Sequence, residues 1–451
     1  MAGVVPNAPG TGNNIPVSSY TAGISESFPN VNRQRVIESS INSKETIDFM
    51  PVNMGVNQVL DDRFVEFRIN GILGSFIDLS SLIIEFSVRP VNANDLSVIG
   101  DTINISLVNG LANTIFKSVS VFLNEKVIES NPIYNYTSYI KQLQSINSET
   151  LDNVAKCGGL FDDMNEAGVT RTYEASLYAD DAKTVEKKRL ADIKAYGVDI
   201  YFPLLLDSSS LDMYLLDGVD IRIRLEMAST NWIVKSNTTP SVNLRVGKAK
   251  LWVDRVTPHY NALLALNKVL SAKPLEYVFN KTLHKTFMVG ANESSIMIDQ
   301  PFGKCIPEKL TMVFITNTAY NGRMAENGLY FDHCNLSNTL ITVNGSSVYN
   351  INTSFPSDYS HSYYVTQRTL GLDNVNLISY DSYAKGRSIF CFNFVNEVVD
   401  GSLPVELSAS LRINLTFDTP MRNPTIVILL ADTKGLLTID RARSISCDVR
   451  G

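Results

Sequence analysis

One histidine and one cysteine are adjacent in the sequence, His333 and Cys334, and a Cys–His pair can act as nucleophile and base. Neighbouring residues on a strand point to opposite faces, so these two side chains are not expected to pair. The sequence also lacks a phosphate-binding loop, a G-x-S-x-G elbow, an H-E-x-x-H motif and a G-x-G-x-x-G turn. We therefore predict that the protein is not an enzyme and has no catalytic, cofactor-binding or metal-binding residues.

Three pairs of adjacent acids could bind a hard cation such as calcium through their carboxylates. The pairs are Asp61-Asp62, Asp162-Asp163 and Asp180-Asp181. None has the ligand spacing of a calcium loop, so we expect solvated loop carboxylates instead.

Arginines in alternating segments could form an anion site, at Arg222, Arg224 and Arg412. Each alternates with apolar residues, which favours a solvated sheet face on which the arginine stem covers apolar area. The aromatic residues Trp232 and Tyr363-Tyr364 could stack on sugars, although single aromatics in β loops more often pack locally.

Three more arginines lie near the C-terminus beside two aspartates. They are Arg441, Arg443 and Arg450, with Asp440 and Asp448. They could contact a nucleic acid or a membrane surface, but a short solvated tail is the favoured interpretation.

Charge and cysteine content narrow the classes of protein further. A net charge of −7 excludes the strongly basic surface that drives non-specific nucleic-acid binding, and no sequence-specific binding is expected. The five cysteines are odd in number and widely spaced, which indicates a reducing compartment rather than a disulfide framework. No apolar run is longer than 426–431, and MAGVVPNAPG is not a signal peptide, so we expect neither a membrane span nor secretion.

Hydrophobic alternation predicts an all-β chain. The segments 82–88, 221–227 and 411–417 each place apolar residues at every second position, which is typical of strands with one wet face. Five Asn-Gly and two Asp-Gly pairs lie between short apolar runs, and such pairs tolerate the positive φ of tight turns.

Helical signals are few. Tyr136, Tyr139, Ile140 and Leu143 have the spacing of one amphipathic helix, with Pro132 just upstream. Residues 260–270 predict a helical connector, and 179–195 an exposed helix or projecting loop.

The order of motifs repeats between the two halves of the chain. Each half contains a strand pair (64–88 and 294–316), a short hairpin (118–128 and 338–349) and then a long excursion. An alternating arginine-bearing strand follows (218–228 and 409–419), and then a final long segment (243–256 and 425–440). This order predicts a duplication into two tandem eight-stranded jelly-roll sandwiches, with a few short helices in loops.

The repeat gives a domain organisation. We expect a flexible N-terminal arm at 1–45, a first jelly roll at 46–258 with a long insertion near 130–197, a helical connector at 259–270, a second jelly roll at 271–443 and a tail at 444–451.

Three stretches carry a resemblance to a known family. They are FVEFRINGILGSFIDLSSLIIEFSVRP (64–90), NGLANTIFKSVSVFLNEKVIESNPIYNYTSYIKQL (109–143) and VDIYFPLLLDSSSLDMYLLDGVDIRIRLE (198–226). Over roughly residues 46–443 the chain resembles the double jelly-roll major capsid proteins of double-stranded DNA viruses, of the Polinton, adintovirus and virophage type. The arm and the 170–195 insertion have no clear counterpart in that family.

The resemblance implies a structural protein of the virion. Three chains would form a pseudo-hexameric capsomer that tiles an icosahedral shell around double-stranded DNA, with a minor single jelly-roll protein as a further partner. The excursions 145–197 and 350–387 would form outward towers or clamps between subunits, and the arm would lie on the inner side. The alternative from the residues alone is a tandem β-sandwich carbohydrate-binding protein or adhesin.

Overall fold

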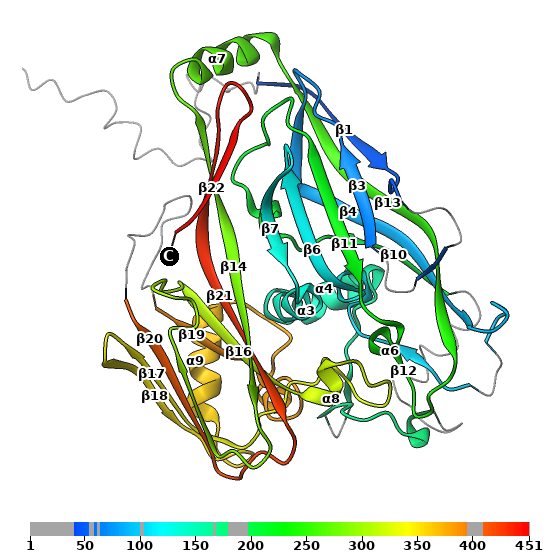
Figure 1. The fold of residues 1–451 in the computed structure, drawn as a ribbon, viewed down its shortest axis with the longest axis vertical. Coiled ribbons are helices and arrows are strands. Elements are labelled where there is room, and N and C mark those ends of the chain that lie inside the picture. The colour runs from blue at the N-terminus through cyan, green and yellow to red at the C-terminus, as the bar shows by residue number, and fades with distance from the viewer. Residues whose placement is uncertain are drawn as a thin grey trace, which may run out of the picture. The chain divides into compact units, whose positions relative to one another are not determined.

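A computed structural model describes residues 40–53, 58–60, 64–99, 103–165, 168–178, 197–394 and 409–450. It contains two sandwiches of antiparallel strands, with short helices in the connections between strands (Figure 1). Several segments discussed above lie outside the described residues: Asp61-Asp62, Asp180-Asp181, the whole segment 179–195, and the arm up to residue 39.

The first sandwich consists of two facing sheets. One sheet has the order β1 (Ile41–Phe49), β13 (Val242–Pro258), β4 (Phe76–Asn92) and β10 (Val198–Pro203), and β2 (Gln58–Leu60) also pairs with β13. The other has the order β3 (Phe64–Ile69), β11 (Ile221–Met227), β6 (Phe116–Leu123) and β7 (Lys126–Asn131).

The second sandwich repeats this topology. Its first sheet has the order β14 (Leu275–Val289), β21 (Thr425–Ile439), β16 (Lys309–Thr316) and β19 (Phe390–Asn393), and β22 (Ile445–Arg450) also pairs with β21. Its second sheet has the order β15 (Ser295–Asp299), β20 (Leu411–Phe417), β17 (Leu336–Val343) and β18 (Ser346–Asn352). Strand by strand the order matches the first sandwich, which confirms the predicted double jelly roll.

The predicted alternation is confirmed in all three segments. Within 82–88, 221–227 and 411–417 the residues of the apolar stripe are buried, and the intervening residues, Ile83 among them, are half-buried or exposed. The strands thus place one apolar face into the core and one face toward solvent or a neighbour. Buried apolar side chains from both sandwiches form one continuous cluster.

Short helices and minor strands fill the connections. The helices are α2 (Leu111–Thr114), α3 (Tyr134–Ser145), α4 (Ser148–Asn153), α6 (Thr230–Ile233), α7 (Tyr260–Leu270), α8 (Asn317–Tyr320), α9 (Ser360–Leu370) and α10 (Tyr380–Tyr383), with the 3-10 turns η1 (Ala155–Gly158), η2 (Ala175–Tyr178) and η3 (Asp207–Ser210). The minor strand pairs are β5 (Ser106–Leu107) with β12 (Val234–Lys235), and β8 (Met164–Asn165) with β9 (Gly168–Val169). The predicted connector 260–270 coincides with α7.

Equivalent tight turns close one hairpin in each sandwich. Asn344-Gly345 joins β17 to β18 and has positive φ at both residues, as a two-residue type I′ turn requires. The corresponding turn between β6 and β7 is Asn124-Glu125, also with positive φ at both residues. Among the described Asn-Gly and Asp-Gly pairs, only Asn344-Gly345 forms a two-residue hairpin turn; the others lie in longer connections.

The structure differs from the predicted organisation at both ends. The arm was expected to extend to residue 45, but β1 begins at Ile41, where it pairs with Pro258. The predicted solvated tail 444–451 is wrong over most of its length, because β22 pairs residue by residue with the end of β21. In both cases the strand is polar and has no strong apolar alternation, so backbone pairing rather than side-chain burial specifies it.

The core of the second sandwich supplies a stability test. Leu415 on β20 is 1% exposed, so Leu415→Ala should lower the free energy of unfolding by about 2–5 kcal/mol through lost burial and a cavity. Its exposed neighbour Thr416 is the control, and Thr416→Ala should change the unfolding free energy by less than about 0.5 kcal/mol. Denaturant titration measures both values, and equal effects would contradict the assigned strand faces.

Candidate functional site: the junction between the two sandwiches

Helix α3 lies between the two sandwiches, and ten of its twelve residues are buried. The predicted helix and its buried apolar residues are confirmed, but the wet face of an amphipathic helix is absent, because polar residues such as Asn135 and Gln142 are also buried. Tyr139 packs near Phe331 of the second sandwich, at 6.0 Å between ring centroids. A helix enclosed on both sides has no wet face, so its polar side chains need partners within the protein. Thr137, Ser138 and Gln144 have such partners, whereas the Gln142 amide has none among the described residues.

The end of α3 is bound to the outer face of the second sandwich. Gln144 Nε2 donates to Thr311 Oγ1 over 3.3 Å and to Cys391 Sγ over 3.4 Å. Lys309 Nζ donates to Gln144 Oε1 over 3.3 Å. Burial raises the pKa of the Cys391 thiol to about 11, so Cys391 stays a protonated thiol at neutral pH. Both ends of one amide thus connect α3 to three residues of β16 and β19.

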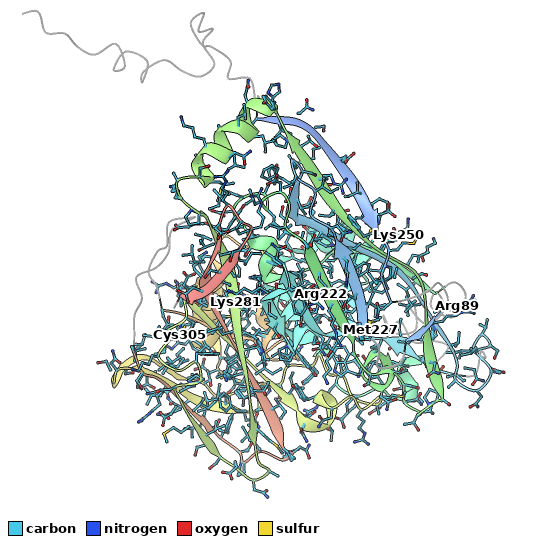
Figure 2. The ribbon with its side chains drawn as sticks, turned by 45° about the horizontal axis from the view of Figure 1, so that its top comes forward. Arg89, Arg222, Met227, Lys250, Lys281 and Cys305 are labelled. Carbon is cyan, nitrogen blue, oxygen red and sulfur yellow. The ribbon has the colours of Figure 1, made fainter. Side chains whose placement is uncertain are left out.

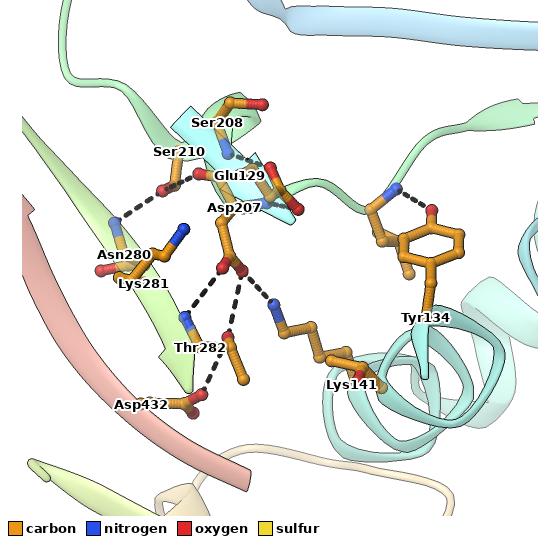
Figure 3. Close-up of polar contacts among 12 residues, drawn as sticks. Glu129, Tyr134, Lys141, Asp207, Ser208, Ser210, Asn280, Lys281, Thr282 and Asp432 are labelled. Carbon is orange, nitrogen blue, oxygen red and sulfur yellow. Dashed lines mark hydrogen bonds and ion pairs between the residues drawn. The ribbon is translucent and has the colours of Figure 1, made fainter. Parts of the chain in front are cut away.

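Asp207 is the central acceptor of the junction (Figure 3). Its Oδ1 accepts from Lys141 Nζ of α3 over 2.8 Å and from Thr282 Oγ1 of β14 over 3.0 Å. Its Oδ2 accepts from the Thr282 backbone N–H over 2.8 Å. Burial alone would lower the pKa of Lys141, but the carboxylates of Asp207, Asp432 and Glu129 raise it above its ordinary value. A buried carboxylate with one cation and two further donors is fully satisfied.

Glu129 on β7 holds the turn that carries Asp207 (Figure 3). Its two carboxylate oxygens accept from the backbone N–H groups of Asp207 and Ser208, each over 3.0 Å. Burial and the nearby Asp207 charge raise the pKa of Glu129 to about 7, while the two N–H groups favour its ionised form. The Glu129 carboxylate therefore holds the backbone of η3 in place, and this fixes the position of the Asp207 side chain.

The junction also covers a sheet edge. β14 is the outermost strand of its sheet, so its outward N–H groups have no strand partner. The N–H of Asn280 donates to Ser210 Oγ over 2.7 Å, and that of Thr282 to Asp207. Between them, Lys281 Nζ donates to the carbonyl of Ile128 over 2.8 Å. The first sandwich thus replaces a missing strand with side chains.

A second set of contacts joins the sandwiches at their turns. Arg443, expected in a solvated tail, binds the Asp217 carboxylate and donates from Nε to the Asp217 carbonyl over 2.8 Å. Asn124 Nδ2 donates to the carbonyl of Arg443, and Lys126 Nζ to that of Ile445, over 2.8 and 2.9 Å. The β21–β22 turn is thereby fixed against the first sandwich.

The long excursions meet at a third set of contacts. Asp162 and Asp163, considered above as cation ligands, instead bind Nη2 of the buried Arg387 over 3.0 and 2.7 Å. Arg387 Nη1 donates to the carbonyl of Leu377, and the N–H of Val169 to that of Lys385. The described parts of 145–197 and 350–387 therefore contact each other within one chain.

The remaining sequence candidates have ordinary structural partners. Trp232 is 4% exposed and donates from Nε1 to Tyr136 OH over 3.1 Å, so its ring is closed to a sugar. His333 stacks on Phe355 and accepts from the Asn335 N–H, while burial raises the pKa of Cys334 well above its usual value. His333 and Cys334 precede β17 in a turn rather than lying on a strand, and they do not pair.

The arginines of the alternating strands lie on sheet surfaces, as expected. Arg222 binds Glu125 and covers the Phe122 ring, with 3.9 Å from its guanidinium carbon to the centroid (Figure 2). Arg224 covers Phe64 in the same way at 3.9 Å. Arg412 on β20 pairs with Asp299 on the neighbouring β15. Of the two tyrosines, Tyr363 donates to the Ile378 carbonyl and Tyr364 is 55% exposed.

The part of the chain that the structure describes holds no group of three His, Cys, Asp or Glu side chains suited to a metal ion. Within the same residues, no helix combines the length and apolar character needed to cross a membrane. A hollow of about 530 Å³ opens beside the Asp207 cluster, but its charged groups, among them Lys141, Lys309 and Asp432, already bind one another.

The fold has clear relatives among solved structures. A chain of the Sputnik virophage, solved by cryo-electron microscopy, is 11% identical and matches with a TM-score of 0.61 over 95% of this chain and 92% of that one. The Faustovirus major capsid protein matches with a TM-score of 0.58 at 10% identity, over 93% and 96% of the two chains. The mavirus major capsid protein matches with a TM-score of 0.52 at 10% identity, over 99% and 97%.

By sequence, no family model and no curated protein matches the chain. The structural likeness therefore shows a shared double jelly-roll fold across nearly the whole length of each protein.

Removing the buried cation between the excursions should destabilise the protein. Arg387→Gln leaves Asp163 buried without its cation, so we expect a loss of about 3–5 kcal/mol of unfolding free energy. Lys156→Gln breaks an exposed pair with Asp152 and is the control, with an expected loss of about 0–1 kcal/mol. Comparable losses in denaturant titrations would show that the Arg387 pair is no more than a surface contact.

The buried Lys235 should give the protein a distinctive pH dependence. Its ammonium is 1% exposed and has no hydrogen-bond partner among the described residues, and burial lowers its pKa from 10.5 to about 7. Between these two values the unfolded chain binds more protons than the folded one, so this group makes stability rise with pH. Lys235→Met should remove that rise and increase stability at pH 7. Denaturant titrations at pH 7, 8 and 9 measure the free energy of unfolding of both proteins. The same pH dependence in wild type and variant would contradict this prediction.

Proposed function

We propose that this chain is a major capsid protein of an icosahedral double-stranded DNA virus. The observation that carries the proposal is the match of both sandwiches, over nearly their full length, to the major capsid proteins of Faustovirus and mavirus and to a chain of the Sputnik virophage. Three copies form a capsomer, and capsomers tile the shell.

The duplicated fold supports a trimer with a pseudo-hexagonal outline. Each chain contributes two sandwiches of the same topology, so three chains contribute six similar units. A head-to-tail contact closes a ring when its rotation fits the number of units. The three sets of contacts at the junction hold the two sandwiches of one chain in a defined orientation, as such a closed ring requires.

The proposal includes a location and partners. The protein resides in the virion, where neighbouring capsomers and a minor single jelly-roll protein at the fivefold positions are its partners. Its role is structural and not enzymatic, in line with structural neighbours that are capsid proteins. The alternative of a carbohydrate-binding protein loses one of the three aromatic residues considered for sugar stacking, because Trp232 is buried against Tyr136.

The mass and shape of the purified protein test this function. Light scattering should give 3 × 49.9 = 149.7 kDa for the trimer, and electron microscopy should show hexagonal particles or closed shells. The negative charge on each chain should make assembly into shells more efficient as salt screens repulsion between capsomers. A monomer at every protein and salt concentration, with no ordered assemblies in the microscope, would rule the proposal out.

A further inference from the structure

The two sandwiches differ in how one corresponding edge is covered. β1 and β14 occupy the same end position in their sheets, and both have an outer edge without a strand partner among the described residues. The edge of β14 is covered by η3 and β7 of the first sandwich. The edge of β1 has no such cover within the described chain, and β1 is exposed along most of its length.

A polar motif recurs beside both edges. In the second sandwich Thr282 Oγ1 lies 3.2 Å from Asp432 Oδ1, directly opposite on β21, so that its one proton is shared between Asp432 and Asp207. Asp432 also binds Lys309 over 2.8 Å. In the first sandwich Thr46 Oγ1 donates to Asp254 directly opposite on β13 over 2.6 Å.

In that first sandwich Asp254 also binds Lys44, over 3.0 Å. The two motifs therefore share a threonine on β1 or β14 and an aspartate opposite it on β13 or β21. Each aspartate also binds a lysine, which comes from β1 in the first sandwich and from β16 in the second. Within the described residues, the motif of the second sandwich is contacted by the other sandwich, through Asp207, whereas the motif of the first sandwich is not.

The surface that covers β14 also has a counterpart. In the first sandwich the turn residue Asn124 exchanges two hydrogen bonds with Asp220, and its Nδ2 reaches Arg443 of the second sandwich. In the second sandwich Asn344 exchanges the same two hydrogen bonds with Ser410. Its Nδ2 has no partner among the described residues, and the adjoining β18 is exposed along most of its length.

We propose that the outer face beside β1 of one copy binds the β17–β18 hairpin and β18 of a second copy. The contact repeats, between copies, the junction that each chain makes internally between its own sandwiches. The partner is thus another copy of this chain, and the contact is head-to-tail. This inference rests on the proposed function and specifies which surfaces the trimer uses.

The side chains at both surfaces suit an interface. On the face of the sheet that contains β1, Tyr201 of β10 is 47% exposed, and its ring reaches across β4 to pack edge-on against Trp252 of β13, the strand next to β1. Lys250, labelled in Figure 2, lies over the same Trp252 ring. β18 presents Val348, which is 47% exposed, amid neutral serines and asparagines. Aromatic residues in the centre of a patch with few unpaired charges are typical of protein interfaces.

One carboxylate on either surface should break the trimer. Tyr201→Asp and Val348→Asp each add a charge that the contact would have to bury, so we expect at least a tenfold lower trimer fraction at a given concentration. Met297→Asp is the matched control, because Met297 is 62% exposed on β15, at the opposite edge of the sheet that contains β18. It should stay trimeric. Circular dichroism melting verifies that all three variants are folded.

Mixing the two disrupted variants tests the pairing itself. Tyr201→Asp retains an intact β18, and Val348→Asp an intact face beside β1, so one intact contact can form between them but no ring can close. Cross-linking with one variant isotopically labelled should give mixed pairs of 2 × 49.9 = 99.8 kDa, well above the number of like pairs. Mixed pairs no more frequent than like pairs would overturn the proposal.

The outcomes separate this inference from the proposed function. If wild-type protein is trimeric and both variants remain trimeric, the surfaces are wrong and the capsid role stands. If wild-type protein never self-associates, the capsid role itself fails.

Discussion

The buried carboxylate of Asp207 is the interaction on which the arrangement of the two sandwiches depends. It reaches the junction because Glu129 holds the η3 backbone, and it is satisfied only when Lys141 and Thr282 are both in place. Removing Lys141 would leave the Asp207 charge without its cation in a low-dielectric region, which is far less favourable than leaving a surface pair unmade. The same carboxylate accepts from the Thr282 N–H of an outer strand, so one residue meets an electrostatic and a backbone requirement. Apolar packing supplies the stability of each sandwich, whereas this polar network fixes how they meet.

Much of the fold could be predicted from the sequence because period-two alternation directly reports which face of a strand is buried. The segments 82–88, 221–227 and 411–417, and the order of motifs in the two halves, followed from that signal. This signal is absent from segments whose structure is determined by backbone pairing or by burial on two sides. β22 is a polar segment that is stabilised by pairing with β21, so its sequence lacks the apolar alternation of a strand. α3 is enclosed by two sandwiches, so its apolar residues do not mark its whole buried surface.

The junction residues were beyond sequence reasoning for a related reason. Glu129, Asp207 and Arg387 are ordinary charged residues in the sequence, and only the meeting of segments more than 70 residues apart buries them. His333, Cys334 and Trp232 were candidate functional residues because side chains of these types can take part in catalysis or stack on sugars. The structure gives each of them a local packing partner. Asp162-Asp163, the one acid pair that falls within the described residues, has a structural role, although its partner is an arginine and not a cation from solution.

Joining two like sandwiches in one chain also changes how the molecule can evolve. In a ring of six identical single-sandwich subunits, a substitution would appear at all six contacts, and each would have to tolerate it. In a ring of three fused chains, the internal and external contacts are encoded by different codons. The internal contact, formed as the chain folds, can accumulate buried charges such as Asp207 and Lys141. The external contact must first exist as a free surface in water, and the neutral residues of β18 meet that requirement.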